Sequence, residues 1–462
     1  MSSYSISPKL KSNRVFILQK SELEKRFDPS WYVYLKSIQG FKHKKVAFKN
    51  LLLDNPQYGA NEIGIERETN TEPRYIRITD INDFGELENE LGKTASVIEE
   101  KYFLKENDLL LARSGNTVGK SYLHKDVGYD CFFAGYMIRF KIDISKVIPQ
   151  YIFAYTQTDF YRKWIKAVQR TTGQPNINAE EYRSLEILLP DTLVQEKIVN
   201  IYFGFLSQKK QNEAEAEKLL TSIDDYLLKE LGIILPTPPE NTLKNRIFIV
   251  PVSQLSGNRL DVNYYNPQVL SLVNVIKSAK YSTQLKKIYS SISTGFNNET
   301  RFIEEGIKFL RTQNIRPVEL DVENTLFTKD ESVRITSIGD LLFTRIGVGV
   351  GDVSYNDKGD FAISDNVICL KLKDNKIGKF ISLFLNTELG KVLLNREKRD
   401  TARAIISYEN ILNLPIPVPP LDKQKDIAKH ITDIRQQAKQ LKDKTKEALK
   451  KASDEIEKIL LD

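Results

Sequence analysis

Cysteine and histidine are scarce in this sequence. The 462 residues include two cysteines, Cys131 and Cys369, and three histidines. Two cysteines cannot build the disulfide framework of a small secreted protein, and no histidine stands beside a cysteine at the spacing of a zinc site. We therefore expect a reduced, cytoplasmic protein with no metal site.

Long apolar runs are scarce as well. The first residues, MSSYSISPKLKSNR, lack the apolar core of a signal peptide. Ile201 to Leu206 is among the longest apolar candidates, and it is a fraction of the roughly 18 residues that span a bilayer. The sequence predicts no membrane role.

The size and charge of the chain set broad limits on its function. With 41% hydrophobic and 28% charged residues over 462 positions, we expect two or three domains. Lysine and arginine outnumber aspartate and glutamate by 68 to 61, which gives a net charge of +7 and a pI of about 8.9. This mild basic excess permits binding of a polyanion but does not establish it.

The chain contains an internal repeat of about half its length. Matching residues recur in the same order, displaced by 232 positions at the start of the repeat and by 229 near its end. A unit of this length has the size of a globular domain plus a helix, so two copies imply two similar surfaces. The matched pairs include Arg14/Arg246, Asp28/Asp261, Arg113/Arg345, Gly119/Gly351, Thr158/Thr387, Pro190/Pro419 and Gln195/Gln424.

Each copy shows the same order of expected elements. Short β-type runs come first, at 74–81, 108–113 and 136–142 in the first copy and at 308–315, 340–346 and 367–372 in the second. A helical run follows at 151–168 or 380–396, then an extended segment at 185–190 or 414–420. A long helix ends each copy.

The long helices are predicted over residues 195–231 and 424–460. Apolar residues in the second helix follow a 3,4 spacing for more than four heptads, which is typical of a coiled-coil seam. In the first helix Lys209 and Asn212 interrupt the seam. We expect the two helices to pack antiparallel within one chain; the alternative is that each pairs with another subunit.

The sequence therefore predicts the fold class α+β, with two similar mixed α/β domains and two long helices that form an antiparallel coiled coil. The first domain is placed at residues 1–190 and its helix at 191–232. A Pro-rich linker at 233–245 precedes the second domain at 246–420 and the second helix at 421–462.

One segment is close to a phosphate-binding P-loop. Residues 114–121, SGNTVGKS, have Ser114 in place of the first glycine, and the second copy has Asp352 where the first has Lys120. A carboxylate would repel phosphate, so we interpret both segments as glycine-containing turns between strands. The glycines at 347–351 are not followed by a helix, as a dinucleotide loop would require. We find no catalytic centre and expect no cofactor.

Basic and polar side chains suited to nucleic acid recur at the turns and ends of both copies. Lysine and arginine neutralise phosphates, and arginine, asparagine and threonine can also hydrogen-bond to base edges. The alternative for any one group is an ordinary solvated surface. The candidates for DNA contact are Lys42, Lys44, Arg113, Asn116, Thr117, Lys120, Arg170, Thr172, Arg345, Arg396, Arg399 and Arg403.

These features together resemble the specificity (S) subunit of type I restriction-modification systems. The similarity rests on the duplicated order and on particular segments, and the second copy departs from it at Ala402 to Ile405, where a Gly-Gln-Pro-type segment is lost. The matching segments are Arg26-Phe27-Asp28, Asp108 to Gly115, Thr172-Gly173-Gln174-Pro175-Asn176-Ile177, and Leu189-Pro190 with Gln195 to Ile198.

The resemblance implies a division of labour with partner proteins. Each globular region would be a target recognition domain that reads one half of a split, asymmetric site on double-stranded DNA. The paired helices would set the spacing and dock methyltransferase (M) subunits, and restriction (R) subunits would join through the complex. S-adenosylmethionine would belong to M and ATP to R, so the chain itself would be non-catalytic.

Two other classes of function stay open on the sequence alone. One is a protein-binding scaffold whose repeated domains bind peptides on a coiled coil. The other is an enzyme fused to its own recognition domains, which is disfavoured because the duplication leaves no unduplicated stretch of catalytic size.

Overall fold

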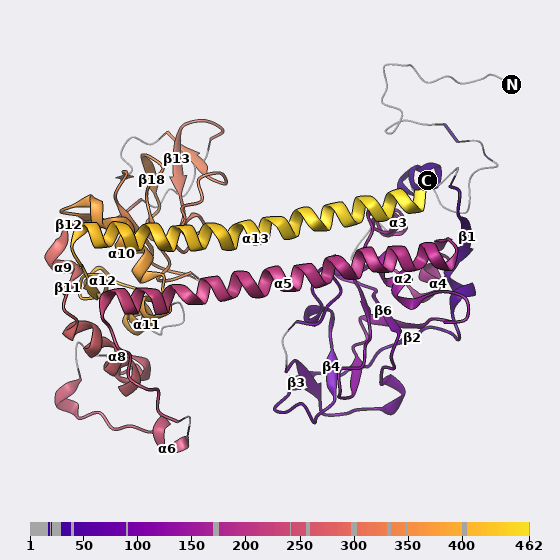
Figure 1. Cartoon of the computed structure of the whole chain (residues 1–462), viewed down its shortest axis with the longest axis horizontal. Helices are drawn as coiled ribbons and strands as arrows, with labels where there is room; N and C mark the ends of the chain where they lie inside the picture. Colours follow the sequence, from indigo (N-terminus) through magenta and orange to yellow (C-terminus); the bar gives the residue numbers. More distant parts are fainter. Residues whose placement is uncertain are drawn as a thin grey trace. The chain divides into compact units, whose positions relative to one another are not determined.

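The computed structural model describes residues 17–18, 20, 29–37, 41–88, 91–169, 175–240, 242–255, 259–296, 303–329, 334–347, 349–399 and 404–461. The chain forms two compact units. Unit 1 comprises residues 1–212 and 443–462, and unit 2 comprises residues 213–442. Each of the two long helices, α5 and α13, therefore contributes one end to each unit (Figure 1).

The globular part of unit 1 is built on two four-stranded sheets and one two-stranded sheet. Their strand orders are β2-β9-β6-β7, β3-β5-β4-β8 and β1-β10. In Figure 1 the sheet that contains β3 and β4 lies farther from α5 than β6 does. The strands are β1 (Lys44–Ala47), β2 (Gln57–Tyr58), β3 (Gly64–Glu66), β4 (Arg74–Ile76), β5 (Lys93–Ala95), β6 (Asp108–Ala112), β7 (Ser121–Leu123), β8 (Cys131–Phe133), β9 (Met137–Lys141) and β10 (Glu186–Leu189).

Helices cover the β6 sheet of unit 1. They are α1 (Pro29–Ser37), α2 (Pro149–Tyr155), α3 (Asp159–Val168) and α4 (Ala179–Arg183). The prediction of one continuous helix over 151–168 is wrong at its centre, because α2 ends at Tyr155 and Thr158 caps the start of α3 by accepting a hydrogen bond from the amide of Tyr161. The break lets α2 and α3 pack their apolar faces into one core.

Unit 2 repeats most of the sheet plan of unit 1, except that one sheet has β15 beside β18 at its edge where unit 1 has β3 beside β5. Its strand orders are β12-β19-β16-β17, β14-β13-β18-β15 and β11-β20, and β13 runs parallel to β18 as β4 does to β8. The strands are β11 (Ser282–Gln284), β12 (Tyr289–Thr294), β13 (Ile307–Leu310), β14 (Leu326–Thr328), β15 (Ile335–Thr336), β16 (Leu341–Thr344), β17 (Val353–Tyr355), β18 (Phe361–Ile363), β19 (Val367–Leu372) and β20 (Pro415–Pro417).

The helices of unit 2 also follow the order of unit 1. The predicted helix over 380–396 is again broken, here by Thr387, which caps α11 through the amide of Gly390. The helices are α6 (Leu243–Arg246), α7 (Val262–Tyr265), α8 (Pro267–Ser278), α9 (Leu285–Ile288), α10 (Gly378–Leu385), α11 (Glu388–Glu397) and α12 (Tyr408–Leu412).

Equivalent hydrogen bonds verify the register of the repeat. The amide of Arg113 donates to the carbonyl of Tyr136, and the amide of Arg345 donates to the carbonyl of Asn366. At the start of each long helix, the side chains of Gln195 and Gln424 donate to a proline carbonyl five residues earlier. The two helices can therefore be compared position by position with a displacement of 229.

The long helices are α5 (Thr192–Leu231) and α13 (Leu421–Leu461). In unit 1 the first half of α5 packs with the last turns of α13, and Ile198, Tyr202, Ile456 and Leu460 share one core. In unit 2 the last half of α5 packs with the first turns of α13. Within each unit the helices therefore run antiparallel, which confirms the predicted pairing inside one chain.

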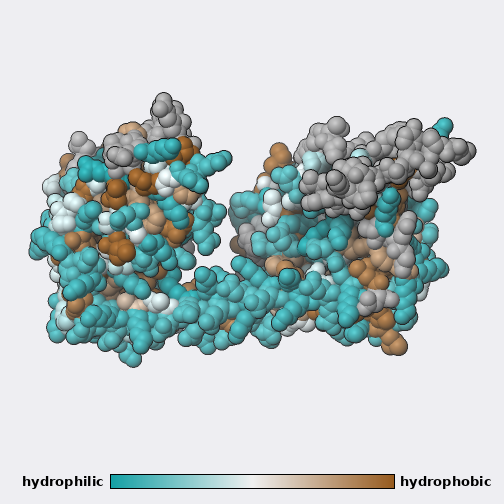
Figure 2. All heavy atoms as spheres, turned by 90° about the horizontal axis from the view of Figure 1, so that it is seen from above, coloured by the Kyte–Doolittle hydropathy of each residue, from teal (hydrophilic) through white to brown (hydrophobic). Residues whose placement is uncertain are grey.

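The interrupting residues of the first helix have partners in unit 1. Asn212 is 8% exposed and its side-chain amide donates to the hydroxyl of Thr445 at 3.1 Å. Lys209 forms an ion pair with Glu86 at 3.1 Å. The side chains on the outward faces of the long helices are hydrophilic, as the teal surface in the lower middle of Figure 2 shows.

The seam of the second helix shifts near its C-terminus. A strict continuation of the 3,4 spacing would place Ile459 in the seam, but Ile456 and Leu460 are each 1% exposed and Ile459 is only partly buried. None of the helices in the described part of the chain combines the length and apolar character needed to cross a membrane.

Candidate nucleic-acid interface

A cluster of loops at the end of β6 brings together several of the predicted site residues of unit 1. Arg113 follows β6 directly, and the short 3₁₀ helix η5 (Gly115–Thr117) begins two residues later. The segment from Pro175 to Ile177 lies against this turn, because the amide of Gly115 donates to the carbonyl of Pro175 and the amide of Ile177 donates to the carbonyl of Arg113. Asn116 is exposed on this loop.

Arg113 is held by an aromatic ring. Its guanidinium carbon lies 4.9 Å from the ring centre of Tyr58 on β2, a cation–π distance. Its Nε atom is buried and has no hydrogen-bond partner among the described residues. The guanidinium is therefore oriented by stacking and keeps hydrogen-bonding capacity, which suits recognition of a base edge or a phosphate.

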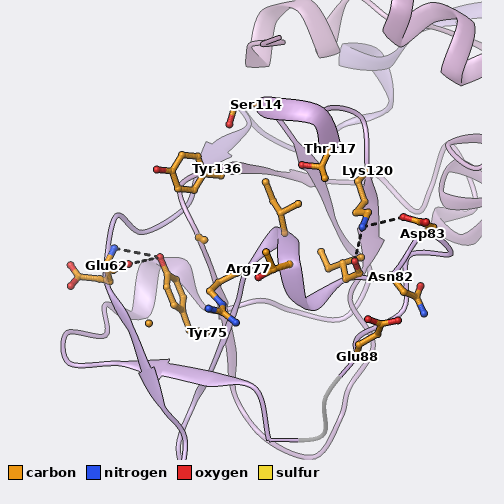
Figure 3. Close-up of a pocket in the computed structure, with 15 residues that line it drawn as sticks. Glu62, Tyr75, Arg77, Asn82, Asp83, Glu88, Ser114, Thr117, Lys120 and Tyr136 are labelled. Carbon is orange, nitrogen blue, oxygen red and sulfur yellow. Dashed lines mark hydrogen bonds and ion pairs between the residues drawn. The ribbon is translucent and has the colours of Figure 1, made fainter. Parts of the chain in front are cut away.

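A hollow of about 750 Å³ opens beside this cluster (Figure 3). Tyr136, whose side chain is 67% exposed, lies at its edge in the turn between β8 and β9. Arg77 lies in the hollow and is bound to Asp80 at 2.7 Å. This hydrogen bond and the charge of Asp80 outweigh the effect of burial and raise the pKa of Arg77 above its ordinary value. Donors and acceptors are thus mixed across the hollow, which favours hydrogen-bonded readout over simple charge attraction. Its polar lining residues include Glu62, Asn82, Ser114, Thr117 and Lys120.

The P-loop-like segment forms the turn of a β-hairpin. Strands β6 and β7 pair antiparallel on either side of it, and Gly115 and Gly119 adopt φ values of +76° and +88°. The amine of Lys120 donates to the carbonyl of Ile81 at 2.7 Å and lies 3.3 Å from a carboxylate oxygen of Asp83 (Figure 3). The predicted turn between strands is confirmed. Lys120 has partners inside the domain, so its contact with DNA stays a prediction.

The equivalent place in unit 2 has different chemistry. Arg345 follows β16, and its guanidinium lies 3.4 Å from the carbonyl of Asp365. Asn366 takes the place of Tyr136, and Asp352 takes the place of Lys120. The same backbone frame thus presents different side chains in the two copies.

Two predicted residues lie on the small sheet of unit 1. Lys42 and Lys44 are exposed at the start of β1, which pairs with β10. Between them, His43 contacts the carbonyl of Ile459 near the end of α13 at 3.0 Å. No hydrogen bond or ion pair of the described residues joins these lysines to the Arg113 cluster, so they form a separate basic surface.

Arg396 belongs to a buried network in unit 2. Its guanidinium forms an ion pair with Glu397 at 2.6 Å and stacks 3.8 Å from the ring centre of Tyr264. Arg259 lies 4.1 Å from the centre of the same ring and donates to the carbonyls of Arg396 and Lys398, at the C-terminal end of α11 and just after it. Arg396 thus has partners inside unit 2, whereas the side chain of Arg399 is exposed.

The remaining predicted residues, Arg170, Thr172 and Arg403, lie outside the described residues. Contact of any of the predicted residues with DNA stays a prediction.

The described residues offer little for catalysis. Burial raises the pKa of Cys131 to about 11 and that of Cys369 to about 12, although nearby arginines partly oppose the first shift, so both thiols stay protonated. Burial lowers the pKa of His124 to about 4, with partial compensation by Asp126. No group of three or more metal-ligating side chains occurs in the described part of the chain.

Sequence reasoning missed Tyr58 and Tyr136. Neither belongs to a basic group or a glycine motif, and their proximity to Arg113 arises from pairing between distant strands. A usable signal was present for Tyr136, because the repeat aligns it with Asn366 in an otherwise similar strand turn. Divergence at an equivalent turn marks a position where the two domains present different chemistry.

Comparisons with known proteins agree with the geometry. The family model of the type I restriction modification DNA specificity domain matches residues 31–221 and 276–451. The type I restriction enzyme StySPI specificity subunit of Salmonella potsdam is 20% identical over 380 residues, which cover 79% of this chain and 75% of that protein.

A second relative has the same degree of identity. The type I restriction enzyme MjaVIII specificity subunit of Methanocaldococcus jannaschii is 20% identical over 390 residues, which cover 80% of this chain and 82% of that protein.

Among solved structures, the S subunit of a type I restriction-modification system from M. genitalium aligns with a TM-score of 0.48 and 15% identity, over 93% of this chain and 99% of that one. Because the family model matches once in each copy and over most of the sequence, the chain belongs to the type I restriction-modification DNA specificity family.

Proposed function

We propose that this protein is the DNA-recognition subunit of a type I restriction-modification complex, and that each globular domain reads one half of a bipartite, asymmetric DNA site. The observation that carries the proposal is the duplicated loop cluster. Arg113 and Arg345 occupy the same place at the end of equivalent strands, while Tyr136 and Asn366 differ beside them. Two domains with the same backbone arrangement but different side chains at this position are suited to recognise two different DNA sequences.

Arg113 and Arg345 are the residues we assign first to DNA. Both follow a buried strand, so their positions are set by the sheet rather than by a flexible loop. Asn116 and Thr117 add neutral donors and acceptors in the first domain, and Arg399 adds an exposed cation in the second. A net charge of only +7 fits a protein whose non-specific affinity for DNA comes partly from its partners.

The long helices set the separation of the two half-sites and dock two methyltransferase subunits, through which restriction subunits join the complex. The partner subunits then carry out the chemical reactions of the complex with S-adenosylmethionine and ATP, and this chain recognises the DNA site. The complex acts in the cytoplasm, where its DNA is accessible and the two thiols stay reduced.

Exchange of one domain tests the proposal. Residues 14–190 are replaced by the same region of a diverged relative, the chain is co-expressed with its methyltransferase subunit, and the methylated DNA is sequenced. One half of the modified site should change, while the other half and the spacer length stay the same. A change of both halves together would refute the idea of two autonomous readers.

Single substitutions separate the roles of the arginines. Arg113→Ala should alter or relax one half of the methylated sequence if Arg113 contacts a base, and should weaken binding to all sequences and flatten the salt dependence if it contacts a phosphate. The control is Arg246→Ala, which removes the same charge from an exposed position on α6, a helix outside the sheets of unit 2. This variant should leave the methylated sequence unchanged.

A further inference from the structure

The two copies differ at the place where a loop and a short helix lie against a long helix. In unit 1 this place is filled by aromatic rings. Phe84 lies in the loop, Phe153 on α2, and Phe203 and Phe205 on α5. Their ring centres are 5.8 Å apart for Phe84 and Phe205, and 6.2 Å apart for Phe153 and Phe203.

The loops of the two copies are equivalent. Gly85 in unit 1 has a φ of +73°, and Val318 in unit 2 has a φ of +72°, a conformation that valine rarely adopts. The amide of Val318 donates to the carbonyl of Val353, which holds this loop against β17. The loop of unit 2 is therefore in place, and the difference between the copies lies in the side chains around it.

In unit 2 smaller or charged side chains occupy the corresponding positions. With the displacement of 229, Ser382 replaces Phe153, Thr432 replaces Phe203, and Arg435 replaces Leu206, while the counterpart of Phe205 is the buried, smaller Ile434. A hollow of about 480 Å³ lies there, with Ser382, Thr432 and Arg435 in its lining. The space that unit 1 fills with its own aromatic rings is open in unit 2.

The walls of this hollow combine apolar and cationic groups. Leu220, Val318, Tyr355 and Leu383 contribute apolar surface. Lys358, Lys379, Arg435, Lys439 and Lys442 contribute positive charge, against two acidic lining residues, Asp357 and Glu319.

Most of the positive charge is not neutralised locally. Lys358 lies 3.7 Å from Asp357, and Asp224 on α5 offsets part of the charge of Arg435. Lys379, Lys439 and Lys442 form no ion pair with any described residue. The hollow is therefore net positive, which favours an anionic occupant.

Two buried polar atoms in the hollow lack partners. The Ser382 side chain is on a residue 1% exposed, and its Oγ atom makes no hydrogen bond with the described residues. The buried Nε atom of Arg435 also has no such partner. Unsatisfied buried polar groups are rare and are often completed by a ligand or water.

We propose that this hollow, formed by α10, α13 and the loop at 317–319, binds an acidic segment of a partner protein that presents an aromatic side chain. The aromatic ring takes the place that Phe153 and Phe203 fill in unit 1, and flanking carboxylates meet the lysines at the rim. The site belongs to the second copy alone, so partner docking on the two copies is unequal. The inference does not depend on DNA recognition by either domain.

A labelled peptide tests the proposal on the full chain. The probe is the fluorescein-labelled nonapeptide Gly-Asp-Glu-Asp-Phe-Asp-Glu-Asp-Gly, and its binding is followed by fluorescence anisotropy. We expect saturable binding that falls at least tenfold when the phenylalanine is changed to alanine, and at least tenfold when the acids are changed to their amides. Equal binding of either altered peptide would overturn the proposal.

Variants of the chain locate the binding site. Ser382→Phe and Thr432→Phe introduce the residues of unit 1 and should each reduce binding at least tenfold, whereas Ser382→Ala keeps the space and removes only the hydroxyl, so it should weaken binding far less than Ser382→Phe does. Lys439→Gln should weaken binding severalfold, and Lys286→Gln, at an exposed lysine on α9, should not.

Folding and DNA serve as controls. The melting temperature and DNA binding of Ser382→Phe should match wild type, since unit 1 folds with phenylalanine at this position. If Ser382→Phe binds the peptide as wild type does, or if duplex DNA displaces the peptide from wild type, the proposed occupant is wrong.

Discussion

Arg259 offers a direct test of how the second domain is held together. Its side chain is 6% exposed, and its guanidinium contacts the Asp261 carboxylate at 2.5 Å and the Glu397 carboxylate at 3.6 Å. It also donates to the last carbonyls of α11, including that of Lys398 at 2.7 Å. We consider the substitution Arg259→Met, which keeps the length of the side chain and removes its charge and donors.

The expected loss of folding stability depends on which contacts Glu397 and Asp261 lose in this variant. Glu397 keeps Arg396 at 2.6 Å and the amide of Asn410 at 3.1 Å, so it stays paired. Asp261, whose side chain is 17% exposed, loses its hydrogen-bond donors. Removal of one partner from a buried ion pair lowers the free energy of unfolding by about 3–5 kcal/mol. Because Glu397 keeps two of its partners, we expect Arg259→Met to lie at the lower end, at about 3 kcal/mol.

Hydrogen–deuterium exchange at α11 measures this cost. Since about 1.4 kcal/mol corresponds to a tenfold change in an equilibrium constant, amides that exchange by opening of α11 should exchange about 100-fold faster in Arg259→Met. The matched control is Arg162→Met, which breaks an exposed pair with Asp159 in unit 1 and should cost at most about 1 kcal/mol.

The pH dependence of the folding stability provides a second test of the role of Arg259. Partial burial opposes ionisation of Asp261, but the hydrogen bonds and charge of Arg259 outweigh it and hold the pKa below the ordinary value of 3.8. This contribution to stability is present above the unfolded pKa and is lost as pH falls through the folded pKa, so wild type and Arg259→Met should converge in acid. Exchange of α11 that changes less than threefold at neutral pH would refute the reasoning.

Three further predictions concern the seam, the glycine turn and a buried histidine. Ile434→Asp places a carboxylate at a seam position 7% exposed and should destabilise the protein by at least about 3 kcal/mol, seen as a lower melting temperature by circular dichroism; exposed Gln437→Asp should change it little. The isolated chain should show no saturable ATP binding that Lys120→Ala abolishes, because the Lys120 amine is bound to Ile81 and Asp83; such binding in a titration would contradict the turn assignment. Because the folded pKa of His124 is about 4 and its ordinary value is 6.5, the unfolded chain gains a proton first, and stability should fall as pH drops from about 6.5 to about 4. His124→Gln should flatten the urea midpoint over that range, and an unchanged slope would show that other groups cause it.

The duplication, the two long helices and the glycine turns could all be predicted from the sequence. These features are local or repeated: a 3,4 apolar spacing marks a helix face, and a displacement that stays constant marks a duplicated unit. Antiparallel pairing followed from the same information, because each helix carries a seam that it cannot bury alone. The breaks at Thr158 and Thr387 were missed, although threonine is a common N-cap, since apolar residues continue across both sites.

The tertiary structure alone decided which polar residues act together. Arg113 meets Tyr58 because β2 and β6 both pair with β9, and Arg259 reaches α11 across 138 residues of sequence. The sequence predicted Arg396 only as a DNA contact, and the structure adds that it belongs to an internal network. The hollow around Ser382 depends on the volumes of side chains from five separate segments of the chain. Burial, partner choice and empty space are properties of contacts between residues far apart in the chain, and no local pattern encodes them.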